Sequence, residues 1–317
     1  MKKICLVLFF LLPLTPYVYA GEEEWTLLGP PGGRGVWTLA ADTTARIIYT
    51  TGFEICKTSD GGQNWIDITD RLPPEYRAIA CVTMHPYNPN IVYVGGWGQV
   101  PNKPGHTQGV VYKTTDAGST WVYAGSGFPT GPGSDVWVIA IDPLHPDTLY
   151  AGTLGWGVYK STNGGEDWVL KPNGLFNPYV VSIVIDPQNS QILYAASCGA
   201  EPFLGNAFKS IDGGESWTEV DSGFFPPRWP ETPPGDTVRG DISSLAINPL
   251  NPNILYIGVK LSVEEDPPFI KSWYTVYKST NGATSWARVD SGLPLVDYVI
   301  ALAVDPKHPD TVYVGFN

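Results

Sequence analysis

Residues Thr58–Trp65 read Thr-Ser-Asp-Gly-Gly-Gln-Asn-Trp, and the same spacing of Ser/Thr, Asp/Asn, Gly and Trp returns four more times. We call this eight-residue pattern the box. Its Asp or Asn can accept N–H bonds within a tight turn, and its Gly can adopt the left-handed backbone conformation. Short apolar strands flank every copy, so each box predicts the turn of a β-hairpin. The other copies end at Trp121, Trp168, Trp217 and Trp286, the last with Ala283 in a Gly position.

A second hairpin is predicted between successive boxes. Its clearest copy is Val138–Pro143, followed by a turn and then by Thr148–Gly152. Related copies are Ile79 to Gly95, Val181 to Ala196, Ile242 to Gly258, Ile300 to Gly315 and a degenerate one at Trp37 to Gly52. The two hairpins give four strands per repeat, named A to D, at a period of about 45 to 70 residues. The sequence therefore predicts an all-β fold, a β-propeller with six recognisable four-stranded blades, the last of them incomplete.

The boxes make the sequence resemble the Asp-box, or BNR-repeat, propellers, which include sialidases, sortilin-type receptors, xyloglucanases and photosystem II assembly factors. The resemblance covers nearly all of Glu24 to Asn317. It implies a structural role in the turn for the acidic or amide residue and the Trp of every box. These residues are Asp60, Trp65, Asp116, Trp121, Asn163, Trp168, Asp212, Trp217, Asn281 and Trp286. The motif is specific for the architecture and nearly silent about chemistry.

The two ends of the repeat region predict how the ring closes. Trp25–Gly29 resembles a strand D without its own box, which suits closure of the last blade by an N-terminal strand. Val312–Gly315 resembles a strand B, with no strand C or box after it. We expect a chain truncated at its C-terminus; six blades with an incomplete last one, or a seven-bladed ring, remain alternatives.

The first twenty residues have the layout of a secretory signal peptide. Lys2 and Lys3 precede the apolar run Ile4 to Leu12, and Val18-Tyr19-Ala20 supplies small residues for cleavage. We assign 1–20 to the signal peptide and 21–317 to the propeller domain. No second apolar stretch of about 18 residues follows, so we predict no transmembrane segment after signal removal. The protein is expected to be secreted, periplasmic or at the cell surface.

Composition narrows the range of partners. The chain has 19 Lys and Arg against 31 Asp and Glu, a net charge of -12, which disfavours nucleic acid as a partner. Cys56, Cys81 and Cys198 are irregularly spaced and are expected to be buried thiols, with one disulfide as the alternative. His85, His145 and His308 each precede Pro in A–B turns, where they are interpreted as turn residues. No metal site and no cofactor are predicted.

Candidate ligand-binding residues lie where the repeats differ from one another. In an antiparallel blade the A–B and C–D turns share one face, and the B–C and D–A connections share the other. The first face is nearly stereotyped, whereas the second varies, as in Gly96 to Gly109 and Val259 to Thr275, which are expected to be irregular loops. Tryptophan can stack on sugar rings or receive a peptide side chain. The candidates are Trp97, Trp137, Trp156 and Trp229, with Asp135, Arg239 and Asp241 as polar partners.

Two classes of function fit these features. The preferred hypothesis is a non-catalytic binding or scaffold propeller for a glycan or an extracytoplasmic protein. The alternative is a glycoside hydrolase of xyloglucanase-like or sialidase-like type, in which converging carboxylates act as acid and base. A sialidase is disfavoured because the sequence contains no Arg-Ile-Pro motif. No catalytic residue is assigned from the sequence.

Overall fold

The computed structural model describes residues 36–52, 54–100, 103–199, 205–220, 237–264, 270–289, 291, 293 and 299–316. The predicted signal peptide, the predicted closing strand Trp25–Gly29 and the candidate residue Trp229 lie outside these ranges. Within them, no helix is long and apolar enough to cross a membrane.

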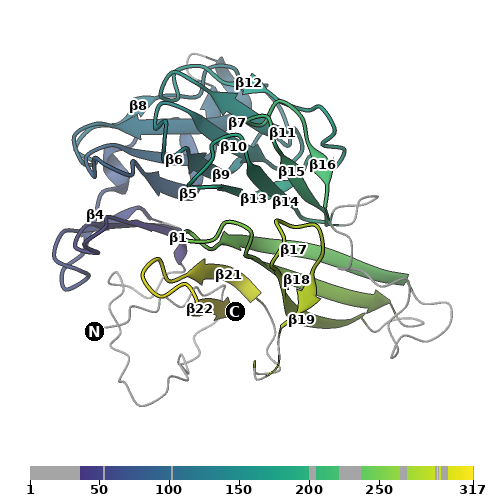
Figure 1. The fold of residues 1–317 in the computed structure, drawn as a ribbon. Coiled ribbons are helices and arrows are strands. Elements are labelled where there is room, and N and C mark those ends of the chain that lie inside the picture. Colours follow the sequence, from purple (N-terminus) through teal and green to yellow (C-terminus); the bar gives the residue numbers. More distant parts are fainter. Residues whose placement is uncertain are drawn as a thin grey trace.

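The described strands form five four-stranded antiparallel sheets, each built from four consecutive strands (Figure 1). We call these sheets the first to fifth blades. The first and second blades comprise β1 (Val36–Ala41), β2 (Ile48–Gly52), β3 (Cys56–Thr58), β4 (Ile66–Asp67), β5 (Tyr76–Met84), β6 (Val92–Val100), β7 (Lys103–Thr114) and β8 (Val122–Tyr123). The third and fourth comprise β9 (Val136–Ile141), β10 (Leu149–Thr153), β11 (Gly157–Ser161), β12 (Val169–Leu170), β13 (Val180–Ile185), β14 (Leu193–Ser197), β15 (Ala207–Ser210) and β16 (Thr218–Glu219). The fifth comprises β17 (Thr237–Ile247), β18 (Leu255–Glu264), β19 (Ile270–Ser279) and β20 (Ala287–Arg288).

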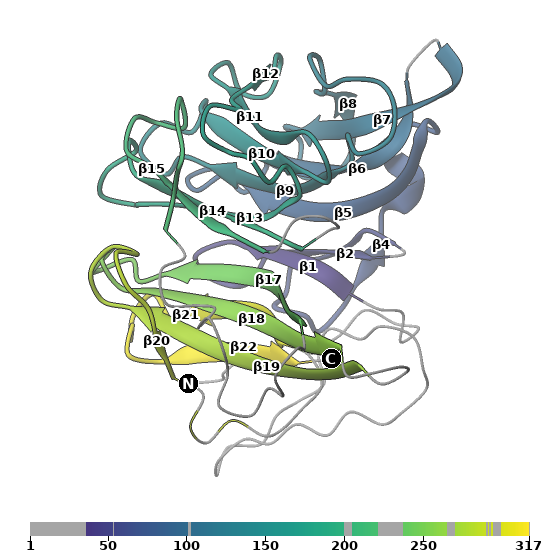
Figure 2. The same cartoon turned by 90° about the vertical axis from the view of Figure 1, so that its right-hand side faces the viewer.

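A sixth sheet contains two described strands, β21 (Val299–Val304) and β22 (Val312–Phe316). The first strands of consecutive sheets contact one another in chain order, from β1 through β5, β9, β13 and β17 to β21. The sheets therefore follow one another around the molecule as stacked blades (Figure 2). The protein is an all-β propeller with five four-stranded blades, as the repeat predicted. The described residues do not establish the sixth blade as a four-stranded one.

Each box forms the turn between the third and fourth strands of its blade. In the fourth blade, the Ser210 hydroxyl donates to Asp212 Oδ1 at 2.8 Å and accepts the N–H of Gly214 at 2.8 Å. Asp212 Oδ1 also accepts the N–H of Ser216 at 2.9 Å. Gly213 and Gly214 both have positive φ, +70° and +82°, and Ala117 and Ala283 adopt the same conformation in their boxes. The turn is thus held by its own side chains, which explains the spacing of the motif.

The boxes and the A–B turns lie on the same face of the molecule. Gly213 N donates to the carbonyl of Gln191 in the A–B turn of its blade at 3.0 Å, and Gly164 N donates to that of Asp147 at 2.8 Å. The first, second and fifth blades repeat this bond from Gly61 to Arg46, from Ala117 to Asn90 and from Gly282 to Asn253. We call this side of the molecule the box face. The B–C and D–A connections therefore emerge on the opposite side, which we call the variable face.

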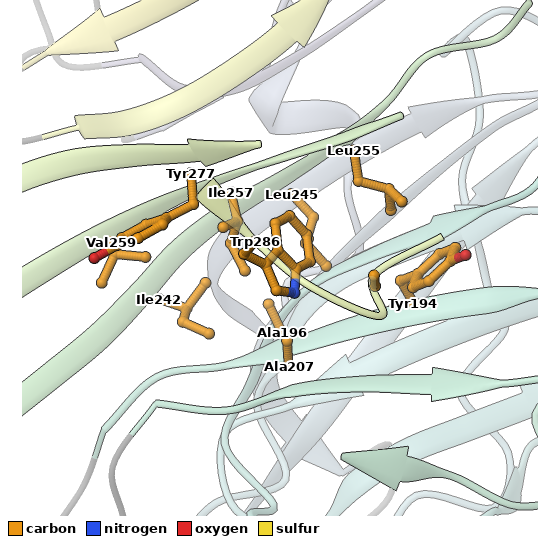
Figure 3. Packing of buried hydrophobic residues seen from close by; sticks show 11 residues of the cluster. Tyr194, Ala196, Ala207, Ile242, Leu245, Leu255, Ile257, Val259, Tyr277 and Trp286 are labelled. Carbon is orange, nitrogen blue, oxygen red and sulfur yellow. The ribbon is translucent and has the colours of Figure 1, made fainter. Parts of the chain in front are cut away.

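The core lies between neighbouring blades. Figure 3 shows Trp286 of the fifth-blade box packed among side chains of both blades, including Ile242, Ile257 and Ala196. Tyr194 of the fourth blade belongs to the same buried cluster. The box tryptophans of the second to fifth blades are all at most 8% exposed. Burying a Trp between two sheets is worth several kcal/mol, about 3–5 on the scale of Trp→Ala substitutions, so the boxes help to hold the blades together.

Two expectations for the variable face differ from the structure. Residues 96–109 and 259–275 were expected to be irregular loops, but their described parts, 96–100, 103–109, 259–264 and 270–275, belong to long antiparallel ribbons, β6 with β7 and β18 with β19. The β18–β19 pairing runs without a register shift from Leu255–Ser279 to Glu264–Ile270. β-branched and aromatic residues within 259–275 favour this continuation of the strands, and comparison of repeat lengths could not detect it.

The three described cysteines are free thiols. Cys56 and Cys81 are buried in β3 and β5, and Cys198 is half-buried after β14. Burial raises the pKa of Cys81 to about 12 and that of Cys56 to about 11. These thiols are therefore protonated at neutral pH and behave as small apolar side chains, in keeping with the buried-thiol prediction.

Candidate functional site

Asp135 stands on the variable face immediately before β9, the first strand of the third blade. Its carbonyl accepts the N–H of Leu154 at 3.1 Å, and Pro132 O accepts the indole N–H of Trp156 at 3.1 Å. The D–A segment 132–135 thus packs on the B–C turn 154–156. Glycine is needed at this contact, because a Cβ on Gly155 (φ +143°) would lie only 3.1 Å from Cα of Gly133. We call segments 132–135 and 154–156, together with Phe176, the Asp135 surface.

The carboxyl group of Asp135 lies in a half-buried environment. Burial raises the pKa of this carboxyl above its ordinary value, and its own backbone N–H opposes that shift. A raised pKa means that the carboxyl keeps its proton up to a higher pH, and the protonated acid is the form that donates a proton to a leaving group. Among the candidate polar residues, Asp135 is therefore suited to act as a general acid.

Two exposed aromatic rings belong to the Asp135 surface. Trp156 is 43% exposed, and its ring is fixed by the bond to Pro132 O. Phe176, 51% exposed, packs edge-on against Phe208 with 5.1 Å between ring centroids. The N–H groups of Gly155 and Gly157 both donate to Pro178 O, which ties the Trp156 turn to the segment that carries Phe176. A partly open, immobilised Trp ring is the kind of surface that stacks on a sugar.

Sequence reasoning missed Phe176, because it counted only tryptophans that the blade pattern left unexplained. A signal was present, since Phe176 lies in a D–A connection between Leu175 and the Asn177-Pro178 pair. In the structure Leu175 is buried, whereas Phe176 points outward.

Asp241 occupies in the fifth blade the position that Asp135 occupies in the third. Both residues stand directly before the A–B pair that precedes the bulge of the ladder, Val136 with Thr153 and Ile242 with Val259. The corresponding residues of the second and fourth blades are Ala78 and Tyr179. Strand β13 contacts both β9 and β17, so the blade of Tyr179 lies between those of the two aspartates.

The Asp241 carboxylate is held by the protein. Its Oδ1 accepts the N–H of Gly199 at 2.8 Å, and its Oδ2 lies 4.0 Å from Nζ of Lys260. Asp241 thus connects the first strand of the fifth blade to the B–C connection of the fourth, whereas the partner described for the Asp135 carboxyl is its own backbone N–H.

The other candidate residues are placed as follows. Trp97, half-buried in β6, pairs with Ala78 and Gly109, and Gly109 N donates to Ser134 Oγ at 2.8 Å beside Asp135. Trp137 is half-buried at the bulge of β9. Arg239 pairs through its backbone with Ser262 on the β17–β18 ribbon, and its side chain lies outside the described atoms. The structure therefore brings Trp97, Asp135 and Trp156 to one boundary between blades, while Arg239 and Asp241 lie on another blade.

No cluster of three or more His, Cys, Asp or Glu residues suited to a metal ion occurs in the described part of the chain. The box carboxylates are already engaged inside their turns on the opposite face, as Asp60 and Asp116 are with Asn64 and Thr120.

The fold and this face define a β-propeller that carries an acidic and aromatic surface opposite its box turns. No family model matches the chain. One similar protein is described as a probable oligoxyloglucan-reducing end-specific xyloglucanase from Neosartorya fischeri. It is 26% identical over 145 residues, which cover 42% of this chain and 17% of that protein.

Solved structures confirm the fold. A GH74 enzyme from Niastella koreensis matches with a TM-score of 0.61 and 19% identity, over 88% of this chain and 43% of that chain. YCF48 from Cyanidioschyzon merolae matches with a TM-score of 0.50 and 14% identity, over 91% of this chain and 97% of that one. The chain spans less than half the length of the xyloglucanase and of the GH74 enzyme that it matches.

Proposed function

We propose that this chain is an exported propeller of the Asp-box type that acts on a xyloglucan-like polysaccharide as a glycoside hydrolase, with Asp135 as its proton donor. Its similarity to a protein described as a xyloglucanase supports the substrate class. The observation that carries the proposal is the Asp135 carboxyl, which is half-buried, has a raised pKa and lies on the segment to which the Trp156 ring is hydrogen-bonded. We also propose that residues 1–20 form a signal peptide and that the ring contains a sixth blade.

Hydrolysis of a glycosidic bond uses two carboxyl groups with different roles. One protonates the leaving oxygen, and the other acts as a base or a nucleophile. Asp135 fits the first role, because burial keeps its proton bound to a higher pH than usual. We assign the second role to Asp241, the other carboxylate at the same level of the ring, which Gly199 and Lys260 hold in position.

Substrate positioning falls to the aromatic rings. A sugar ring that stacks on Trp156 would lie over segment 132–135, because Trp156 Nε1 is bonded to Pro132 O. Phe176 extends this apolar area along the next D–A connection. Stacking of this kind tolerates a substituted glucan chain, since it needs only the flat face of a sugar.

A second candidate is glycan binding without hydrolysis. The observation that favours it is the distribution of acids, since Ala78 and Tyr179 take the place of Asp135 in the two neighbouring blades. If Asp241 lies too far from Asp135 to serve the same bond, the surface binds a glycan and does not cleave it.

Release of reducing ends from xyloglucan oligosaccharides tests the proposal. Wild-type chain should release them, Asp135→Asn should lower turnover by about 10²–10⁴-fold, and binding measured by calorimetry should persist. Asp147→Asn is the matched control, because it changes an exposed aspartate of the box face. Binding without turnover by the wild type would favour the second candidate, and the absence of both would contradict the proposal.

A further inference from the structure

A repeated contact joins the box of each blade from the second to the fifth to the blade before it. A lysine in the third strand of one blade donates a hydrogen bond to the carbonyl of the fourth box residue of the next blade. The four bonds are Lys57 to Ala117 at 2.8 Å, Lys113 to Gly164 at 2.9 Å, Lys160 to Gly213 at 2.7 Å and Lys209 to Gly282 at 2.9 Å. The contact recurs at all four boundaries between complete blades, so it belongs to the repeat.

A tyrosine in the second strand completes each of these docking sites. The lysine Nζ atoms lie 5.3 to 5.7 Å from the ring centroids of their paired tyrosines, Tyr49, Tyr93, Tyr150 and Tyr194. Tyr150 OH donates to the same Gly213 carbonyl at 2.8 Å, and a Cβ on Gly214 would lie only 2.7 Å from the Tyr150 ring. Each docking site therefore accepts a turn of two small residues with positive φ, whose first carbonyl faces an ammonium group.

The fifth blade carries the same pair of a tyrosine and a lysine on the side that faces the sixth sheet. Tyr256 and Lys278 face each other across β18 and β19, as Tyr150 and Lys160 do across β10 and β11. Lys278 Nζ lies 5.3 Å from the centre of the Tyr256 ring. Within the described ranges, neither the Lys278 ammonium nor the Tyr256 hydroxyl has a hydrogen-bond partner, and no box turn lies against them.

The sixth sheet places a further hairpin beside this pair. Tyr256 belongs to a cluster with Val299 of β21, against which Val312 and Val314 of β22 pack. In the described part of the chain β22 pairs only with β21, whereas every second strand of the complete blades also pairs with a third strand. A third strand on β22 would be followed by a box, by the order of all five blades.

We propose that Tyr256 and Lys278 form a docking site for a sixth box, carried by a hairpin that pairs with β22 as the third and fourth strands of the sixth blade. The occupant is defined by its chemistry. It has Ser/Thr, Asp/Asn and Trp at box spacing, two small residues with positive φ between them, and a free carbonyl for Lys278. This interaction surface is independent of the proposed hydrolase activity.

A cyclised peptide with the sequence of residues 274–289, which contains the fifth box, tests the site in trans. Cyclisation pre-organises the hairpin and lowers the entropy cost of binding. Titrated by fluorescence anisotropy, the peptide should bind the full chain saturably, and Lys278→Met should weaken binding at least about tenfold. Lys307→Met, an exposed lysine of the sixth A–B turn, is the matched control and should bind like the wild type.

Circular dichroism should first show that both variants retain the wild-type fold. Absence of saturable binding, or equal binding by Lys278→Met, overturns the proposal. Light scattering covers one more outcome. A dimer that Lys278→Met and Asp60→Ala each dissociate would identify the occupant as the Thr58–Trp65 box of a second copy, and would overturn the assignment to a sixth blade.

Discussion

The ammonium group of Lys160 in the third blade donates a 2.7 Å hydrogen bond to the carbonyl oxygen of Gly213 in the fourth. The bond runs from a strand of one sheet to the turn of the next. Lys160 Nζ lies over the Tyr150 ring, 5.7 Å from its centroid, and the Tyr150 hydroxyl donates to the same carbonyl. The box is therefore more than a hairpin turn, because its backbone is also the attachment point for the preceding blade.

Loss of this bond should destabilise the fold. Lys160→Met keeps the aliphatic stem but leaves the Gly213 carbonyl without its charged donor, at an expected cost of about 1.5–3 kcal/mol in unfolding free energy. Urea denaturation measures it. Lys171→Met removes only a surface ion pair with the half-exposed Glu215, so it should cost less than about 1 kcal/mol. Equal losses in the two variants would contradict the attachment role.

Acid should weaken the box turns in a defined pH range. The Ser216 hydroxyl, followed by backbone N–H groups and Ser210, lowers the pKa of Asp212 to about 2. The folded pKa lies below the unfolded value of about 3.9, so this stability is present above pH about 4 and is lost as pH falls through about 2. Asp212→Asn keeps the Oδ1 acceptor, as Asn163 and Asn281 do in their boxes, but cannot titrate.

Denaturation midpoints from pH 6 down to about pH 2 test this expectation. Near neutral pH, Asp212→Asn should unfold at a lower midpoint than the wild type, because it lacks the stabilising carboxylate, and the difference should shrink as pH falls, because only the wild type loses that contribution. An identical acid dependence of the two proteins would show that Asp212 does not contribute to it.

The strand order could be predicted from the sequence, because the box and the A–B hairpin repeat at a recognisable spacing. The predicted hairpin 138–152 corresponds to β9 and β10, and even the degenerate copy 37–52 corresponds to β1 and β2. The long ribbons of the second and fifth blades could not be predicted, because they are insertions that no other repeat shares.

His85 lies in an A–B turn, as predicted, but its predicted equivalence to His145 is wrong. It occupies the position that Asp142 has in the third blade. Its Nδ1 accepts the N–H groups of Tyr87 and Asn88 at 3.1 Å each, as Asp142 Oδ1 accepts those of Leu144 and His145. Sequence alone could not show that an imidazole nitrogen substitutes for a carboxylate oxygen here.

The sequence predicted individual residues of the candidate site but not which of them lie close together. Asp135 and Trp156 were singled out from their place on the variable face, but their proximity depends on the close approach of Gly133 and Gly155. Nothing in the spacing of the two residues indicates that contact. Asp135 lies in the D–A connection from the second blade to the third, whereas Trp156 lies in the B–C turn of the third blade.

Removal of the exposed Trp156 ring should weaken ligand binding without lowering the stability of the fold. Trp156→Ala removes a ring that is 43% exposed and anchored by one hydrogen bond, so the melting temperature should change little. Affinity for xyloglucan oligosaccharides should fall about tenfold, equivalent to about 1.4 kcal/mol, because stacking is lost. Leu144→Ala, at an exposed position of the box face, is the matched control for calorimetry. Equal affinity of Trp156→Ala and the wild type would remove Trp156 from the site.

Hydrogen exchange of the backbone amides with and without xyloglucan oligosaccharides tests most directly whether the Asp135 surface is where ligand binds. We expect slower exchange on ligand addition in segments 132–135 and 154–156 and around Phe176, because bound sugar restricts opening of these connections. Turns of the box face, such as 142–148 and 186–192, should exchange at unchanged rates. Protection confined to the box face, or no protection on the Asp135 surface at saturating ligand, would contradict the account.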